Sequence, residues 1–454
     1  IDAWYGLTFF EYKLPYPGLK AESIRSEAIN QCKEKYIPGL LNDDNVKAII
    51  SKIRSKNYKP LITGVIFDGY RVVFVTYDVD SQKIEIEPKV GSYALSESTL
   101  RIIIRRVLAS YKKGLVASEL ISRFGHKGEL AKRVVKKLYE KLISTKSEKT
   151  NKLFDEWFKL TSQAYPIGPE VAVIARDYGF EEHELKSING AKLLYAVQTY
   201  YALILKLIAA EIAAQYHDTA ARSFLEEIRR IDNPDRLREE FRRLEEGALY
   251  AAYGIRNFLE GEFFSWYLDE WDLDIYNIVK EMINIISEYD FEALLQDIRR
   301  ARDLFKLLYE ELIPRREIRQ RLGIYATPDW LAELVLDELG LTVDNFRKMK
   351  SEGKDPLDLK VLDPGVGTGT FLVLYIQRLG EYLREVYGVE VPEEKAREAL
   401  MKITRNVVGF DIDSLAILTA RTNYLMTLAA TGLLDKKGRE SIEIPIYMAN
   451  SVIT

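Results

Sequence analysis

A glycine-rich segment near the C-terminus limits what this chain can fold into more than any other feature. The segment Asp363-Pro-Gly-Val-Gly-Thr-Gly-Thr-Phe371 follows the short apolar run Leu359–Leu362 and precedes the helical run Phe371–Tyr387. A strand must therefore turn sharply into a helix, which glycines permit because they adopt backbone conformations that other residues resist. Glycines also let a ligand approach the main chain, and the free N–H groups at a helix start favour an anionic group.

The pattern after this turn predicts a parallel sheet. A second helical stretch leads to a strand, a further helix and a last strand, over Glu393–Arg405, Val407–Ile412, a helix from Ser414, and Ile442–Met448. Strands that alternate with helices are typical of a doubly wound α/β domain. We assign residues 316–454 to this domain.

Two common nucleotide-binding patterns do not fit the turn. No Gly-Lys-Ser/Thr follows, so it is not a P-loop, and the third glycine of G-x-G-x-x-G, counted from Gly365, falls on Thr370. Asp411 ends the next predicted strand, where an acid can accept hydrogen bonds from both ribose hydroxyls. It lies about 42 residues after the glycines, twice the ~20 of a dinucleotide fold. This spacing counts against a nicotinamide-dependent dehydrogenase.

Four motifs in this region resemble those of the adenine-N6 DNA methyltransferases of restriction–modification systems, in the order of one permutation of that family. They are Tyr325-Ala-Thr-Pro328 before a helix at Asp329–Leu339, Asp363–Phe371, Gly409-Phe-Asp-Ile-Asp413 and Ala449-Asn450-Ser451. The resemblance implies a Rossmann-like class I methyltransferase domain that binds S-adenosylmethionine.

By this resemblance, Thr327, Asp363 and Gly365 would hold the methionine part of the cofactor and Asp411 its ribose. Ile412 and Asn450 would flank or contact the adenine. Asn450 departs from the Asp of many relatives, although an amide can still bond the adenine amino group, and Val366 is bulkier than common variants. The residues assigned to the cofactor are Tyr325, Thr327, Pro328, Asp363, Gly365, Gly367, Gly369, Phe371, Asp411, Ile412 and Asn450.

The family's catalytic Asn/Asp-Pro-Pro-Tyr/Phe motif would follow the third strand, but the chain stops at Thr454 and contains no Pro-Pro pair. That motif bonds the target amino group and stacks on the flipped base. The chain also begins at Ile1 rather than Met. We therefore expect a fragment of a longer protein that binds the cofactor but does not complete methyl transfer by that mechanism.

A second candidate site lies at the N-terminus. Glu11 and Lys13 belong to the strand-like run Leu7–Leu14, where residues i and i+2 face the same side. With Asp2 on a neighbouring strand, they could bind Mg²⁺ through Asp2 and Glu11 and orient a water for phosphodiester cleavage. This Asp…Glu-x-Lys set resembles the restriction-nuclease fold, although Glu-x-Lys alone is more typical of a surface charge pair.

The helix expected over Ala21–Leu41 adds Gln31 to this site. Gln31 and Tyr36 resemble an accessory Gln-x-x-x-Tyr motif with one residue too many. The runs Leu61–Phe67 and Tyr70–Tyr77, joined by Asp68-Gly69, predict a hairpin in the same sheet. Asp68 is an alternative acid for the metal, but it is better explained as a turn residue.

The order of these parts resembles the type IIG restriction enzymes, which join cleavage and modification in one polypeptide. We expect a nuclease-like domain over 1–149, with a helical extension at 97–145 broken near Gly125, then an all-α connector over 150–315, in which Asn233-Pro-Asp starts a helix, and the methyltransferase core over 316–454. The apolar run Leu193–Ala214 is interrupted by polar residues and is expected to be a buried helix.

Composition limits the partners. The chain has one cysteine, Cys32, expected to serve packing, and three histidines, so any metal is expected to be held by carboxylates, which favours Mg²⁺. The net charge is −4, but Lys89–Lys149 carries 15 Lys and Arg against 5 Glu, a net of +10. Such a stretch is typical of a surface for double-stranded DNA and equally of solvated helix faces. We expect a cytoplasmic protein that does not enter the membrane.

Two rival hypotheses remain open at this point. The chain could belong to a methyltransferase with a degenerate N-terminal domain, or to a non-catalytic DNA-binding subunit that binds S-adenosylmethionine as a regulator. The preferred hypothesis is the nuclease and cofactor-binding part of a restriction–modification enzyme.

Overall fold

The computed structural model describes most of the 454-residue chain, namely residues 2–54, 60–88, 91–95, 99–100, 103, 113–114, 117–164, 167–217, 223–259, 263–290, 306, 308–311, 313, 315–321, 327–388, 391–434 and 441–450. The chain forms two compact units, residues 1–114 with 288–293, and residues 115–287 with 294–454. Each unit contains both helices and strands. The protein is therefore a mixed α/β protein with more than one part.

The N-terminal unit is built on a mostly antiparallel sheet. Its strands lie in the order β1-β2-β3-β4-β5, with β6 also paired to β4, and of these pairs β2 with β3 is parallel. The strands predicted over Leu7–Leu14, Leu61–Phe67 and Tyr70–Tyr77 are confirmed. The bounds are β1 (Ala3–Tyr5), β2 (Thr8–Tyr12), β3 (Leu61–Phe67), β4 (Arg71–Asp78), β5 (Lys83–Glu87) and β6 (Tyr93–Ala94).

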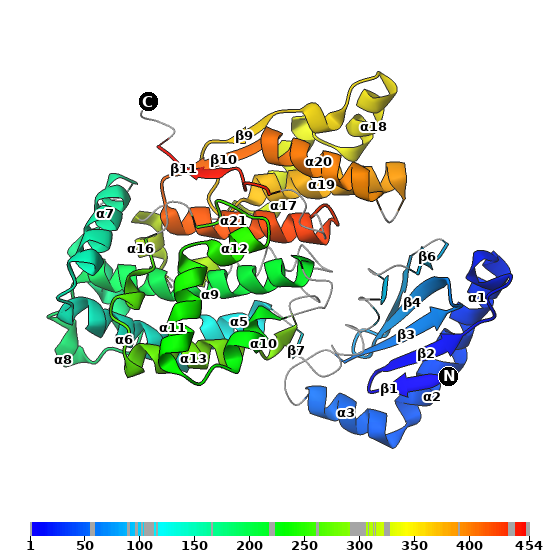
Figure 1. Cartoon of the computed structure of the whole chain (residues 1–454), viewed down its shortest axis with the longest axis horizontal. Helices are drawn as coiled ribbons and strands as arrows, with labels where there is room; N and C mark the ends of the chain where they lie inside the picture. Colours follow the sequence, from blue (N-terminus) through cyan, green and yellow to red (C-terminus); the bar gives the residue numbers. More distant parts are fainter. Residues whose placement is uncertain are drawn as a thin grey trace. The chain divides into compact units, whose positions relative to one another are not determined.

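Helices cover one face of this sheet (Figure 1). They are α1 (Glu22–Gln31), a π-helical turn at Cys32–Tyr36, α2 (Ile37–Asn42) and α3 (Asp44–Arg54), which together confirm the predicted helix over Ala21–Leu41. The core between the layers includes the ring of Phe9 on β2. A Cβ added to Gly64 on β3 would lie 2.5 Å from that ring. Glycine at this position therefore makes room for Phe9.

The hairpin between β3 and β4 is held by the buried carboxylate of Asp68. One oxygen accepts the N–H groups of Tyr70 and Arg71 at 2.9 and 2.6 Å, and the other accepts the N–H of Leu19 at 2.7 Å. Gly18, at φ 57°, packs so closely that an added Cβ would lie 2.4 Å from Asp68 Oδ2. The Asp68 carboxylate thus stabilises the turn, which is the role that the sequence favours for it.

The sequence prediction is wrong in two stretches. A helix is predicted through 97–145, yet Lys113–Gly114 forms a short strand, β7. Its parallel partner, β8 (Tyr289–Asp290), lies in the connector over 150–315 that is predicted to be all-α. Pairing with a strand far along the chain overrides the local helical period. The predicted break near Gly125 is confirmed, because α5 ends at Phe124 and α6 begins at Glu129.

The second unit contains a bundle of helices around the buried helix α9 (Gly190–His217). The stretch Gly190–Ala214 is the one helix in the described part of the chain that is long and apolar enough to cross a membrane, and it is wholly buried inside the protein. This confirms the predicted buried helix. The other helices are α5 (Ala117–Phe124), α6 (Glu129–Ser144), α7 (Glu148–Ala164), α8 (Glu182–Leu185), α10 (Phe224–Arg229), α11 (Pro234–Glu245), α12 (Ala248–Ala252), α13 (Leu273–Ile286) and α16 (Arg316–Arg321). Asn233 caps α11, as predicted.

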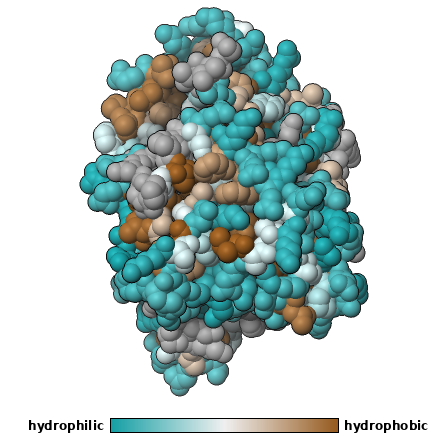
Figure 2. Space-filling model, turned by 90° about the vertical axis from the view of Figure 1, so that its left-hand side faces the viewer, coloured by the Kyte–Doolittle hydropathy of each residue, from teal (hydrophilic) through white to brown (hydrophobic). Residues whose placement is uncertain are grey.

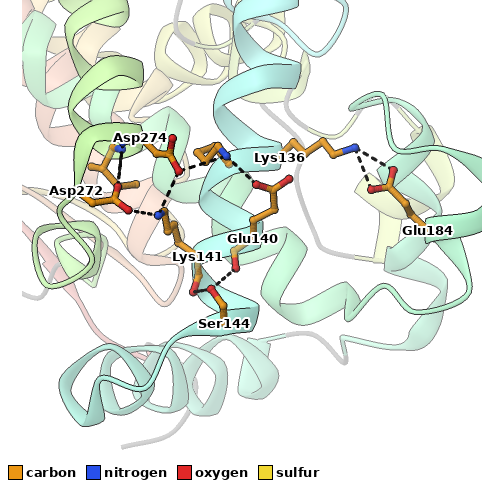
Figure 3. Close-up of polar contacts among 9 residues, drawn as sticks. Lys136, Glu140, Lys141, Ser144, Glu184, Asp272 and Asp274 are labelled. Atoms are coloured by element: carbon orange, nitrogen blue, oxygen red, sulfur yellow. Dashed lines mark hydrogen bonds and ion pairs between the residues drawn. The ribbon is translucent and has the colours of Figure 1, made fainter.

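The basic residues of α6 have acidic partners within the protein. Lys141 bonds Asp272 at the start of α13, and Lys136 lies 2.9 Å from Glu184 of α8 (Figure 3). Arg133 pairs with Glu281 of α13. For this part of the basic stretch, the structure favours charged helix faces over a DNA-binding surface. The side of the molecule in Figure 2 is mainly hydrophilic, with hydrophobic residues in small separate groups.

A three-stranded parallel sheet completes the second unit, in the order β11-β10-β9. The predicted alternation of strands and helices is confirmed, although the last strand is shorter than expected. The bounds are β9 (Val361–Asp363), β10 (Val407–Asp411), β11 (Ile446–Met448), α17 (Asp329–Glu338), α18 (Val343–Ser351), α19 (Thr370–Tyr387), α20 (Glu393–Asn406) and α21 (Ser414–Ala430). Helix α21 packs against the sheet, α19 and α9.

Replacing Asp68 by alanine is expected to destabilise the N-terminal unit by about 3 kcal/mol, because buried N–H groups would lose a charged acceptor. Chemical denaturation monitored by fluorescence measures the loss. The control is Asp80→Ala, which removes an exposed partner of Arg54 and should change stability by less than about 0.5 kcal/mol. Equal effects of the two substitutions would contradict the assigned role of Asp68.

Candidate functional site

The residues predicted to bind a cofactor gather at one edge of the parallel sheet. Gly409 pairs with Asp363, and Asp411 pairs with Met448, so the carboxyl ends of β9, β10 and β11 lie side by side. Asn450 follows β11 at the same edge. Ligands of open parallel sheets bind outside this edge.

Asp411 joins the end of β10 to the glycine-rich turn. One oxygen of its carboxylate accepts the N–H of Gly367 at 2.8 Å, and the other accepts the N–H of Asp413 at 3.0 Å. Gly367 and Gly369 have φ values of 50° and 87°, which only glycine adopts easily. The turn is therefore held in one conformation before any ligand arrives.

Gly365 differs from these glycines. It is exposed, it is not among the glycines with positive φ, and a Cβ added to it would meet no atom within 4 Å. Neither backbone conformation nor packing requires glycine there. Gly365 therefore leaves open space beside the main chain at this edge of the sheet.

The half-buried Asp363 is electrostatically suited to a cationic group. Burial, and after it the nearby charge of Asp411, raises the pKa of the Asp363 carboxyl, although the N–H of Gly365 opposes the shift. A positive group beside this carboxylate would favour its charged form and so oppose the rise in pKa.

The remaining predicted cofactor residues lie at the ends of neighbouring helices and strands. Thr327 and Pro328 precede α17, which packs on α19, and Phe371 is half-buried in the first turn of α19. Ile412 and Asn450 follow β10 and β11 and are half-buried. Tyr325 lies outside the described residues.

Two supporting residues escaped the sequence analysis. Lys306 donates to the carbonyl of Thr327 at 2.6 Å, and the buried amide of Asn423 donates to the carbonyl of Thr368 at 2.8 Å. Asn423 interrupts the apolar run of α21, and such a buried polar residue is the signal that could have revealed it.

Three residues of the second predicted site lie together: Glu11 on β2, Lys13 just after it, and Gln31 at the end of α1. Lys13 Nζ lies 2.9 Å from Glu11 Oε1 and 2.8 Å from Gln31 Oε1. Glu11 is buried, and the hydroxyl of Tyr36 donates to its carboxylate. Burial, followed by this bond and the charge of Glu11, raises the pKa of Tyr36 to about 12. Tyr36 is thus a neutral hydrogen-bond donor at physiological pH.

The π-helical turn explains the extra residue between Gln31 and Tyr36. The N–H of Ile37 bonds the carbonyl of Cys32, five residues earlier, instead of four. Residues five apart therefore share a face here, as residues four apart do in an α-helix. Both side chains reach the Glu11–Lys13 pair. Cys32 is fully buried, which confirms its packing role.

Asp2 lies next to this cluster, beside β2. Its carboxylate accepts the N–H of Tyr12 at 2.6 Å, and its own N–H bonds the carbonyl of Phe10. Asp2 and Tyr36 also line a shallow hollow of about 630 Å³. Among the described residues, no three His, Cys, Asp or Glu side chains form a group that could hold a metal. Two carboxylates nevertheless suit Mg²⁺, which usually keeps several waters.

Comparisons with known proteins give a distant relative. The chain matches no protein-family model. It is 24% identical over 191 aligned positions, covering 33% of this chain, to a Methanocaldococcus jannaschii protein named "Putative type II restriction enzyme and methyltransferase". The match covers 16% of that protein, about a sixth of its length.

A solved structure of a DrdV–DNA complex aligns with 90% of this chain and 32% of its own, at 16% identity and a TM-score of 0.31. At that score the similarity does not establish a shared fold.

Deletion of Glu34 should convert the π-helical turn to a regular α-helix and keep Gln31 and the tyrosine on one face. We expect the free energy of unfolding to change by less than about 1 kcal/mol. The control deletes Lys47 in the regular helix α3, which would turn the buried Ile50 by about 100° and cost about 3 kcal/mol. Chemical denaturation measures the free energy of unfolding of both variants. Equal losses of stability would contradict the interpretation that the π-helical turn absorbs one extra residue.

Proposed function

We propose that this chain is the nuclease and cofactor-binding part of a restriction–modification enzyme. In this proposal the parallel-sheet domain binds S-adenosylmethionine for adenine-N6 methylation of double-stranded DNA, and the N-terminal unit cleaves DNA with Mg²⁺. The order of motifs and the similarity to the archaeal protein support the restriction–modification class. The observation that carries the proposal is the position of Asp363, Gly365 and Asp411, which lie together at the carboxyl edge of the parallel sheet.

The cofactor would supply a methyl group on a positively charged sulfur when bound. Asp363, whose carboxyl pKa is raised in the unliganded protein, would bind the cationic methionine part beside Gly365. Asp411 would share its carboxylate between the ribose and the turn N–H that it already accepts. Asn450 would bond the adenine amino group.

Calorimetric titration with S-adenosylmethionine tests the cofactor site. Gly365→Ala should weaken binding at least tenfold, about 1.4 kcal/mol, because the new methyl group occupies ligand space. Its unliganded stability should stay the same or rise by up to about 1 kcal/mol. The control is Gly39→Ala, another exposed glycine without positive φ or close neighbours, which should bind normally.

Asp411→Ala should also weaken binding, and NAD should not bind to the unchanged protein. A folded protein that ignores S-adenosylmethionine would refute the cofactor assignment. If the complete protein binds S-adenosylmethionine normally but neither methylates nor cleaves DNA, the regulatory-subunit hypothesis would be favoured instead.

The cleavage proposal is supported by the contacts of Lys13 with Glu11 and Gln31. Mg²⁺ would supply a Lewis acid for a phosphate oxygen when bound. Glu11 and Asp2 would be its carboxylate ligands. Lys13, kept in place by Gln31, would orient the attacking water and stabilise the charge that develops on phosphate. Tyr36 would keep the Glu11 carboxylate turned toward the site.

Lys13→Met in the protein expressed from its complete gene should reduce Mg²⁺-dependent cleavage of plasmid DNA about 100-fold or more, with methylation unchanged. Lys47→Met, an exposed lysine on α3, is the control and should cleave normally. Cleavage that survives in Lys13→Met would remove Lys13 from the site. Absence of cleavage in the unchanged protein would favour the degenerate N-terminal domain.

A further inference from the structure

The segment Gly254–Phe258, which follows α12 in the helical part of the second unit, extends the parallel sheet beyond β11. The N–H of Ile442 bonds the carbonyl of Gly254 at 2.8 Å, and the N–H of Arg256 bonds the carbonyl of Ile442 at 3.0 Å. Ile255 and Ile442 form a parallel bridge. The segment that follows α12 thus pairs with the chain that enters β11, where the sequence predicts a continuous strand.

Asn257 continues this pairing with its side chain. Its Nδ2 donates to the carbonyl of Ile444 at 2.9 Å, and its Oδ1 accepts the N–H of Ile444 at 2.8 Å. Only 6% of Asn257 is exposed. A buried amide that satisfies both backbone groups of one residue replaces the peptide of a neighbouring strand.

The side chain of Arg421 on α21 bonds both the segment at β11 and the segment that follows α12. Its Nε and Nη2 donate to the carbonyl of Ile446 at 2.9 and 2.7 Å, and its Nη1 donates to the carbonyl of Phe258 at 3.1 Å. The side chain is buried, with 2% exposed. A buried guanidinium that lost its acceptors would cost much free energy. Arg421 therefore holds the two carbonyls in place relative to each other.

On the other side, β11 bonds β10. The N–H of Gly409 donates to the carbonyl of Pro445 at 2.9 Å, and the N–H of Ala449 donates to the carbonyl of Asp411 at 2.8 Å. The three-residue strand β11 is thus held between β10 and the helical part, two residues before Asn450. Short strands have little stability of their own, so the position of Asn450 depends on both supports.

We propose that Asn257 and Arg421 are positioning residues for the adenine side of the cofactor pocket, so that the helical part contributes to cofactor affinity without touching the cofactor. This inference rests on the proposed function, because the pocket is the proposed S-adenosylmethionine site. By reciprocity, cofactor binding should in turn stabilise the segment Gly254–Phe258.

Hydrogen exchange and calorimetry on the same protein test the proposal. Asn257→Ala should speed exchange of the Ile444 and Ile446 amides without cofactor and weaken S-adenosylmethionine binding about tenfold. In the unchanged protein, the cofactor should slow exchange of the Arg256 amide, and Asn257→Ala should abolish that protection. The control Asn151→Ala removes an exposed amide bond on α7 and should change none of these.

Full affinity of Asn257→Ala, or no cofactor-dependent protection of Arg256, would overturn the proposal. If Asn257→Ala does not fold, Asn257→Asp replaces the donor to the Ile444 carbonyl by a charged oxygen and keeps the acceptor of the Ile444 N–H, so its tests are S-adenosylmethionine affinity and cofactor-dependent protection of the Arg256 amide. If the unchanged protein binds no S-adenosylmethionine, the proposed function fails. In that case, faster exchange of the Ile444 amide in the variant still shows that the helical part holds β11.

Discussion

Helix α21 is buried on every side, and the second unit is organised around this constraint. All residues from Ser414 to Ala429 are buried. A helix without a polar face must lie between other layers, and here α9 packs on one side and the parallel sheet on another. The helical part and the sheet therefore share one interior, and neither could bury α21 alone.

The same burial explains why polar residues of α21 form hydrogen bonds with neighbouring elements. Buried polar groups in proteins usually have a hydrogen-bond partner, and on this helix some of the partners are backbone carbonyls of neighbouring elements. Asn423 bonds the glycine-rich turn, and Arg421 bonds the chain at β11 and after α12. One helix thus fixes both the turn and the third strand.

In the N-terminal unit, the buried charge of Glu11 has a comparable role. Its carboxylate lies under the helices and is balanced by Lys13 and by the hydroxyl of Tyr36. Removing one partner of such a pair leaves an uncompensated buried charge. The cluster constrains where α1 and the π-helical turn lie on the sheet. The hydrogen bonds of Asp68 do the same for the hairpin that follows β3.

The sequence alone determined the strand–helix order of the parallel sheet, the acids at its carboxyl edge, and the shared direction of Glu11 and Lys13, because these depend on local period and spacing. It also placed α9 in the interior from its composition. Only the tertiary structure decided that Gln31 and Tyr36 both reach the Glu11–Lys13 pair, because the sequence shows an extra residue but not the π-helical turn that absorbs it. The pairing of Asn257 with Ile444, 187 residues apart, likewise left no local signal. Contacts between distant segments follow from how layers pack, which a local pattern does not encode.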